Sequence, residues 1–216
     1  EEAVEEEEEA EGVAAPAATA EEEAAEAEVL QGLEAKGRPL PDLFLSLASR
    51  ADRHGTPAML RLLASHPHLA LYRSPPPRRQ TPLHMACGAA VSGAAGSVRA
   101  LLYGAARLHG WAPPLESLDS QGVSPLMVAA MGGSAEVVQL LLQAGANVSH
   151  RAVSGKLARR DAFDIAVRSA RLERRALWMA ERARVVQLLR DAVEWRAAEA
   201  ALLEEEEEVL GGGVAM

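Results

Sequence analysis

Hydrophobic residues recur at helical spacing in the stretch 119–148. Val137, Val138, Leu141 and Leu142 fall on one face of a helix, and the polar residues of this stretch fall on the other. A shorter apolar run, Pro-Leu-Met-Val-Ala-Ala-Met, lies just before this stripe and contains small residues that allow close packing. The pattern predicts two short helices that pack against each other through their apolar faces.

Residues that cap and end helices flank both apolar runs. Ser124 is a suitable N-cap, and Pro125 fits the first helical position, where its missing N–H costs nothing. Gly132 and Gly133 end the first helix, and Ser134 caps the second. The sequence therefore predicts an antiparallel helix pair with a tight glycine turn.

The same pattern recurs on both sides of this pair. Residues 81–86, Thr-Pro-Leu-His-Met-Ala, begin a first helix forty-three residues before Ser124, and residues 97–103 supply its second helix. Residues 161–166 begin a degenerate copy, whose second helix repeats Val-Val-Gln-Leu-Leu at 185–189. Such internal repetition predicts a tandem array in which neighbouring copies bury a shared core.

The stretch 119–148 resembles the ankyrin repeat, with a T-P-L-H-like start, a short helix, a glycine turn, a V-V-x-L-L helix and a final G-A-N-V. Ser124 stands for the usual Thr and Met127 for the usual His, whereas residues 81–86 are close to the consensus. The resemblance implies an all-α, ankyrin-type solenoid of stacked helix pairs. It predicts about four repeats, two clear and two degenerate, at about 41–69, 76–105, 119–148 and 156–192.

Both end repeats depart from the pattern, as end repeats that face water are expected to do. In 41–69, Thr56-Pro57 begins the second helix, and Leu62 and Leu63 supply its core pair. In 156–192, the first helix is expected to extend through Trp178. An Ala-rich helix then continues to about residue 203 and frays within the acidic, Gly-rich tail 204–216, because negative charge at a helix C-terminus opposes the dipole.

The chain before the first repeat contains two predicted segments. Residues 1–18, with their Glu runs, are expected to be disordered. Within 19–36, Thr19 and Glu22 fit a capping box, and a short apolar stripe follows at helical spacing. This predicts an amphipathic helix over about 20–35 that is too short to be stable alone, so it docks on another element or frays.

The formal net charge of −9 conceals opposite charges in different regions. Residues 1–36 hold fourteen Glu and one Lys, and residues 204–208 are five Glu. The remaining body, 37–203, holds twelve acidic and twenty-one basic residues, a formal charge of +9. Like-charged blocks are usually solvated tails, and the alternative is that an acidic tail covers the basic body or engages a basic partner.

Composition narrows the class of protein further. Hydrophobic residues make up 49% of the chain but aromatic residues only 3%, which suits closely packed helices. The single cysteine, Cys87, excludes an intramolecular disulfide framework and a multi-Cys zinc site. No apolar run approaches the length of about 18 residues that a membrane span needs, and no signal peptide is visible. An intracellular protein is expected, and an organelle reached after removal of a targeting segment stays open.

The residues that could carry chemistry have simpler structural explanations. The resemblance implies that His84 braces the turn and that Asp161 is an N-cap with Asp164 as a turn brace. His66 and His68 have no third ligand nearby in the sequence, so no metal site is expected. Neither a catalytic set nor a phosphate loop is found. We therefore expect no enzyme activity, no cofactor and no small-molecule substrate.

The loops between repeats offer candidate partner contacts. Trp111, in the insertion 104–118, is either an interface anchor or a cover for one end of the stack. Basic residues gather on the loops and would form a stripe along one edge of a stack. The candidate partner-binding residues are Arg78, Arg79, Trp111, Ser120, Gln121, Met131, His150, Arg151, Arg159 and Arg160.

The resemblance implies a non-enzymatic protein–protein interaction module, an adaptor or a stable subunit of a larger assembly. Its expected partner is one dedicated protein or a multi-subunit complex, without membrane insertion. The alternative is a peripheral subunit of a ribonucleoprotein or cytoskeletal assembly, held through the arginine stripe to nucleic acid or another acidic polymer. Arginine outnumbers lysine twenty to two, which fits bidentate carboxylate or phosphate recognition, and a GC-rich genome would give the same bias.

Overall fold

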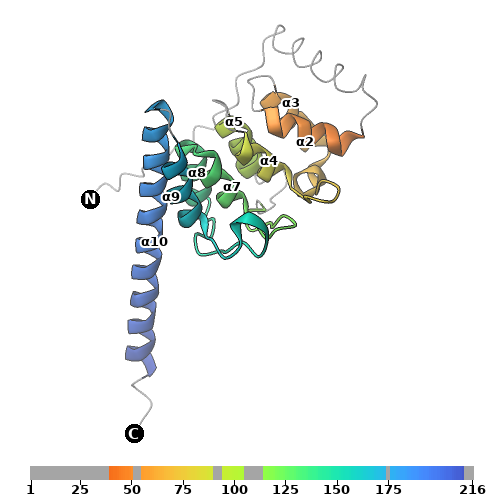
Figure 1. Ribbon diagram of the computed structural model, residues 1–216. Helices are drawn as coiled ribbons and strands as arrows, with labels where there is room; N and C mark the ends of the chain where they lie inside the picture. Colours follow the sequence, from red (N-terminus) through yellow and green to blue (C-terminus); the bar gives the residue numbers. More distant parts are fainter. Residues whose placement is uncertain (1–38, 51–54, 90–93, 105–113, 174–175, 212–216) are drawn as a thin grey trace, which may run out of the picture.

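The protein folds as a row of helical hairpins, seen side by side in Figure 1. The computed structural model describes residues 39–50, 55–89, 94–104, 114–173 and 176–211. Within these ranges every regular element is helical. The N-terminal predictions, a disordered 1–18 and a helix in 19–36, lie outside the described residues, as does Trp111.

Four hairpins make up the stack, each with a first and a second helix. The first helices are α2 (Leu40–Arg50), α4 (Pro82–Gly88), α7 (Pro125–Gly132) and α9 (Ala162–Leu172). The second helices are α3 (Gly55–Ser65), α5 (Ala94–Arg99) with η2 (Ala100–Gly104), α8 (Ala135–Gln143) and α10 (Ala176–Gly211). Two short 3-10 helices, η1 (Pro67–Leu71) and η3 (Gly155–Leu157), lie in connections.

Like helices pack on like helices along the stack. α2 contacts α4, α4 contacts α7, and α7 contacts α9, while α3, α5, α8 and α10 form the parallel outer row. The predicted all-α solenoid of about four repeats is therefore confirmed, and the helix pair of segment 41–69 packs on its neighbour as the first member.

The predicted caps set where the first helices begin. Thr81, Ser124 and Asp161 each accept a hydrogen bond from the backbone N–H three residues later. Pro82 and Pro125 follow at the first helical position. These caps satisfy backbone donors that a helix N-terminus otherwise leaves unpaired, and they align the N-termini of α4, α7 and α9 at one edge of the stack.

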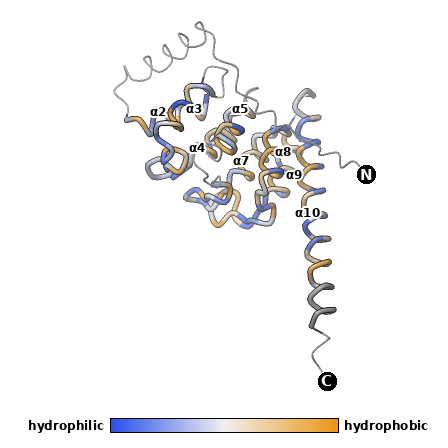
Figure 2. Tube along the Cα trace, turned by 180° about the vertical axis from the view of Figure 1, so that it is seen from behind, coloured by the Kyte–Doolittle hydropathy of each residue, from blue (hydrophilic) through white to orange (hydrophobic). Residues whose placement is uncertain are grey.

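The main hydrophobic core is one cluster to which both rows of helices contribute, and Figure 2 shows hydrophobic stretches along these helices. Leu101, Leu141 and Leu189 occupy the same position in successive second helices and are 2%, 0% and 0% exposed. Ala129 and Ala130 are also buried, so α7 can approach its neighbours closely. Burial of a leucine side chain contributes about 1.5–3 kcal/mol, which makes this repeated leucine row a main source of stability.

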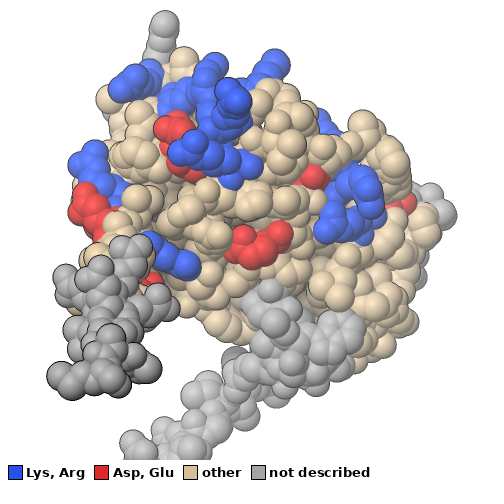
Figure 3. All heavy atoms as spheres, turned by 90° about the horizontal axis from the view of Figure 1, so that it is seen from below, with Lys and Arg blue, Asp and Glu red and all other residues tan. Residues whose placement is uncertain are grey.

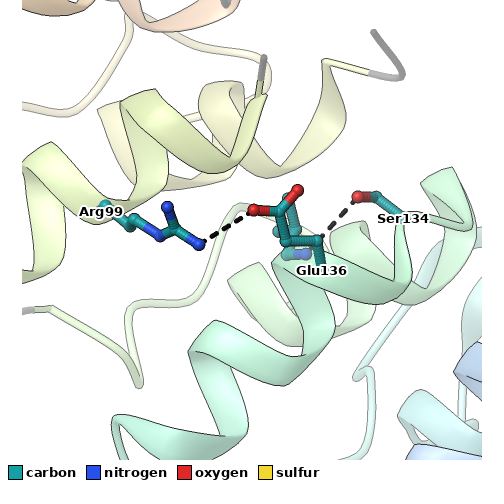
Figure 4. Close-up of polar contacts among 4 residues, drawn as sticks. Arg99, Ser134 and Glu136 are labelled. Carbon is teal, nitrogen blue, oxygen red and sulfur yellow. Dashed lines mark hydrogen bonds and ion pairs between the residues drawn. The ribbon is translucent and has the colours of Figure 1, made fainter. Parts of the chain in front are cut away.

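On the outer surface, α5 and α8 are joined by an ion pair. The Arg99 guanidinium donates to the Glu136 carboxylate at 3.0 Å, close to the Ser134 cap of α8 (Figure 4). The two side chains are 57% and 60% exposed. Such exposed pairs contribute about 0–1 kcal/mol, so packing rather than this ion pair holds the repeats together.

Two helix boundaries inside the stack differ from the predictions. The second helix of the second repeat begins at Ala94, not residue 97, because Ala94 and Ala95 are buried and extend its packed face. The first helix of the last repeat ends at Leu172, so the expectation that it extends through Trp178 was wrong. Trp178 belongs to α10 instead.

The chain turns at Glu173, where a half-buried arginine contacts both the turn and α7. Arg182 of α10 places its Nε 3.4 Å from the Glu173 carboxylate, and its guanidinium donates to the Met131 carbonyl of α7 at 3.1 Å. The side chains of this ion pair are only 15% and 19% exposed. Arg182 thus satisfies a carbonyl at the end of α7 and connects that helix to the turn between α9 and α10.

The C-terminal helix is longer than predicted. It continues through the glutamate run to Gly211, not to about residue 203. Glutamate is a good helix former, and adding residues to an existing helix requires no new nucleation. These two effects outweigh the unfavourable helix dipole. As Figure 1 shows, the end of α10 extends well beyond the stack.

Candidate protein-binding surface

Three loops form one continuous edge of the stack, which we call the loop edge: residues 73–80, 116–123 and 149–160. The Ser120 N–H donates to the Arg78 carbonyl at 2.9 Å, which joins the first loop to the second. The Val153 and Ser154 N–H groups both donate to the Gln121 carbonyl at 3.0 Å, which joins the second loop to the third. The loop edge is therefore a hydrogen-bonded surface on a rigid scaffold.

Side chains add to this bonding. The Asp119 carboxylate accepts from the N–H groups of Gln121 and Val123, at 2.8 and 3.0 Å, and closes the middle loop as an Asx turn. The Arg73 guanidinium donates to the Leu118 carbonyl at 2.7 Å. Glu116 accepts from the Asn147 N–H at 2.8 Å. The acidic groups of the middle loop thus have structural partners.

His84 holds the base of the loop edge by hydrogen bonds, so its predicted role as a turn brace is confirmed. Its Nδ1 lies 2.7 Å from the Thr81 hydroxyl, and its Nε2–H donates to the Val123 carbonyl of the next repeat at 3.0 Å. The ring is 1% exposed. Burial lowers the pKa of His84, with opposing contributions from the Val123 carbonyl and the Asp119 charge. A neutral imidazole therefore ties two neighbouring repeats together.

The tips of the three loops share one unusual backbone conformation. Gly122 has φ = 73°, and the equivalent positions in the other loops are Arg79, with φ = 53°, and Arg159, with φ = 64°. Only glycine adopts this left-handed region without a steric penalty, which for other residues is about 1–2 kcal/mol. Two of the three tips therefore hold an exposed arginine in a strained conformation.

Most of the predicted partner-binding residues meet on the loop edge. Eight lie there, six of them exposed and two, His150 and Arg160, half-buried: Arg78, Arg79, Ser120, Gln121, His150, Arg151, Arg159 and Arg160. Met131 does not join them. It is 47% exposed at the C-terminal end of α7, whereas the loop edge lies at the N-terminus of that helix. Trp111 lies outside the described residues, so its two alternatives remain open.

Charge on the loop edge is divided into separate groups. Figure 3 views the stack from the side of the loops and shows Lys and Arg side chains gathered in separate patches, with acidic side chains between them. The first and third loops carry the basic side chains, and the middle loop carries Glu116 and Asp119. The predicted basic stripe is therefore interrupted at its centre.

A groove on the last repeat was not predicted as a site. It is a hollow of about 500 Å³ on α9, lined by Arg160, Phe163, Asp164, Val167, Arg168 and Arg171. Asp164 corresponds to His84 in the repeat pattern, but its side chain is exposed in this groove and is not buried in the turn, so its predicted role as a turn brace was wrong. Asp161 does cap α9, as predicted.

Other candidate residues are structural. Cys87 is 2% exposed and packs in the core, and burial raises the pKa of its thiol. The His66 and His68 rings meet edge to face, with centroids 5.9 Å apart. Across the described ranges, no three His, Cys, Asp or Glu residues are placed to hold a metal ion. None of the helices searched in those ranges is long and apolar enough to cross a membrane.

Comparison with known proteins agrees with this geometry. The family model described as ankyrin repeats (3 copies) matches residues 45–152, which is half of the chain. The match begins within α2 and ends in the third loop, so it covers the first three helix pairs. No curated protein matches the chain.

Proposed function

Because the chain belongs to the ankyrin repeat family, we propose that it binds an acidic surface of a protein partner along the loop edge, as a non-enzymatic adaptor or a stable subunit of a larger assembly. Ankyrin repeats are protein–protein interaction modules, and proteins of this family are typically not enzymes. What supports the particular partner chemistry is the pair of arginines at the loop tips.

Arg79 and Arg159 occupy positions where glycine would relieve backbone strain, as Gly122 does in the middle loop. Strained residues persist where the surrounding structure holds them, and they concentrate at functional sites. Both side chains are exposed on a surface fixed by hydrogen bonds. A guanidinium presents parallel N–H donors that match a carboxylate, so this placement favours acidic ligands.

The spacing of these arginines favours a protein over a continuous polyanion. Packed helices lie about 8–10 Å apart, so tips two repeats apart are separated by roughly 16–20 Å, which exceeds the Debye length of about 8 Å. Between them lie Glu116 and Asp119. A nucleic acid carries closely and evenly spaced phosphates, some of which would meet these acids, whereas a protein can place carboxylates at two separate points.

The test compares Arg79→Gly/Arg159→Gly with a control of equal charge change, Arg99→Ala/Arg184→Ala, whose side chains lie on the outer row of helices. Affinity recovery from native extract, followed by crosslinking, identifies what binds the full chain. We expect a protein that binds the wild type and the control but binds the tip variant at least about tenfold more weakly, a loss of about 1.4 kcal/mol. Relief of strain should leave the tip variant equally stable or more stable.

Two results would contradict this proposal. Equal recovery of the protein by wild type and tip variant would show that the loop tips are not its binding site. Recovery of RNA or microtubules, lost steeply as salt is raised, would instead favour the alternative of a subunit held to an acidic polymer. A salt series with and without ribonuclease distinguishes these outcomes.

A further inference from the structure

The groove on α9 lies at the end of the described repeat stack, because α9 and α10 form the last helix pair that the structure describes. In the internal repeats, the corresponding positions face the following repeat. His84 bonds to Val123 of the next repeat, and Met127, at the same position in α7, is 0% exposed. The groove is thus the site where a further repeat would stack.

The side chains of the groove differ from those of the internal repeats. Phe163 corresponds to Leu83 and Leu126, which are both 1% exposed, but Phe163 is only half-buried. Val167 adds a second half-buried apolar side chain. An apolar floor that is left partly exposed at the end of a repeat array favours a ligand that covers it.

Basic side chains surround this apolar floor. Arg160, Arg168 and Arg171 line the groove together with a single acid, Asp164. A following repeat of ordinary sequence would bury these charges at a high cost. The lining therefore suits an acidic segment with a small apolar side chain, whose carboxylates remain partly hydrated beside the guanidinium groups.

We propose that this groove binds the acidic segment 1–11 of the same chain. Residues 1–11 hold eight Glu, no basic residue and one valine, Val4. The longest other glutamate run, 204–208, belongs to α10, whose end extends away from the stack. The first segment therefore matches the groove in charge and in its single aliphatic side chain, and the second is held at a distance by its helix.

The chain is long enough for this contact. The path from α2 to α9 crosses three helix-to-helix steps, which at about 8–10 Å each amount to roughly 24–30 Å. Residues 12–39 connect the acidic segment to α2, and an extended chain spans about 3.3–3.6 Å per residue. The connection exceeds the distance even if the predicted helix over 20–35 forms, because a helix still spans about 1.5 Å per residue.

This contact goes beyond the proposed function, because binding of segment 1–11 in the groove would regulate binding of the partner to the loop edge. Arg160 belongs both to the groove and to the loop edge. A bound acidic segment neutralises part of that edge, so it competes with an acidic partner that reaches the third loop. Tethering makes the competitor effective, since a flexible linker maintains a local concentration of about millimolar.

The experiment places a nitroxide spin label on an Ala10→Cys variant of the full chain, which keeps Val4, and measures its broadening of amide NMR signals. Cys87 is buried and should remain unlabelled. We expect selective broadening of α9 signals near Phe163 and Val167. It should disappear when salt is raised from about 0.1 M to about 1 M, which shortens the Debye length from about 10 Å to about 3 Å. Replacing Arg168 and Arg171 with Gln should also remove it.

A matched control carries the label at Ala215→Cys, at the opposite end of the chain. Broadening of α9 that is no greater with the Ala10 label than with this control would overturn the proposal. So would broadening that persists in high salt or in the Arg168→Gln/Arg171→Gln variant. A mixture of spin-labelled and isotope-labelled molecules must show none, because broadening there would identify a second copy as the occupant. No partner is present, so the result is independent of the proposed function.

Discussion

Replacing His84 with methionine tests how strongly one side chain couples two repeats. Methionine has a similar volume and occupies the equivalent position, Met127, in the next repeat, where it is fully buried. The substitution therefore leaves little cavity. It removes the contact of Nδ1 with Thr81 and the bond from Nε2 to the Val123 carbonyl. What changes is the polar bonding at the base of the loop edge.

The expected loss of stability follows from the two groups affected. The ring makes three hydrogen bonds, from the Thr81 N–H and hydroxyl to Nδ1 and from Nε2 to the Val123 carbonyl, and each contributes about 0.5–1.5 kcal/mol. In addition, the Val123 carbonyl loses this partner in a residue that is only 4% exposed, and an unsatisfied buried carbonyl costs about 1–3 kcal/mol. Because part of this cost is relieved by small shifts of the loop, we expect His84→Met to lower the free energy of unfolding by about 2–4 kcal/mol.

Urea unfolding followed by circular dichroism measures this difference, and a pH series adds a second observable. Burial lowers the pKa of His84 below its ordinary value of 6.5, so below that pH the unfolded chain binds a proton that the folded chain does not. Stability must therefore fall as the pH drops below about 6.5, by up to about 1.4 kcal/mol per pH unit from this group. His84→Met should lose that component, whereas His68→Met, at an exposed position, should retain it.

Two results would refute this reasoning. A loss below about 0.5 kcal/mol, the size of an ordinary surface substitution, would mean that His84 does not hold the repeats together. An unchanged pH dependence in His84→Met would mean that another group carries the acid sensitivity.

Three further changes test other parts of the structure. Leu141→Ala should lower the free energy of unfolding by about 2–5 kcal/mol in urea unfolding, because removing a fully buried leucine side chain leaves a cavity. Arg99→Ala should change the free energy of unfolding by less than about 1 kcal/mol, since its ion pair is exposed. Gly133→Ala should cost about 1–2 kcal/mol by the same assay, because φ is 82° and an added Cβ would lie 3.0 Å from Arg182. Cys87 should resist alkylation by iodoacetamide in the native protein and react only on unfolding, because the thiol is buried and its pKa is raised.

The sequence predicts most of this fold because short-range chemistry determines the helix ends. The caps at Ser124 and Asp161 and the glycine turn after α7 are local features, and they lie where the pattern places them. The wrong predictions concern helix ends that depend on contacts with residues distant in the sequence. α9 ends at Leu172 because Arg182, ten residues further along, pairs with Glu173 and bonds to α7. No local signal in 161–178 identifies that contact.

The candidate surface could be predicted in part for a similar reason. Repeat register brings the loops together, so the eight residues on the loop edge follow from their positions between helices. The strain at Arg79 and Arg159 could have been inferred by aligning both with Gly122. The groove could not be predicted from repeat register, because it exists where no described repeat covers α9. The available signal was Phe163, an aromatic residue at a position that the next repeat normally covers.

Departures from the repeat pattern therefore carry the information about binding. Glycine at the loop tips and apolar side chains on the covered faces stabilise a repeat stack. Residues that fit this pattern are explained by folding alone and give no information about binding. This chain has arginine at two of three tips, and it has three arginines around the uncovered face of α9. Neither placement improves packing or backbone geometry. The same residue type breaks the pattern at both places, and its charge is opposite to that of segment 1–11. An acidic ligand, whether a partner or this segment, accounts for both.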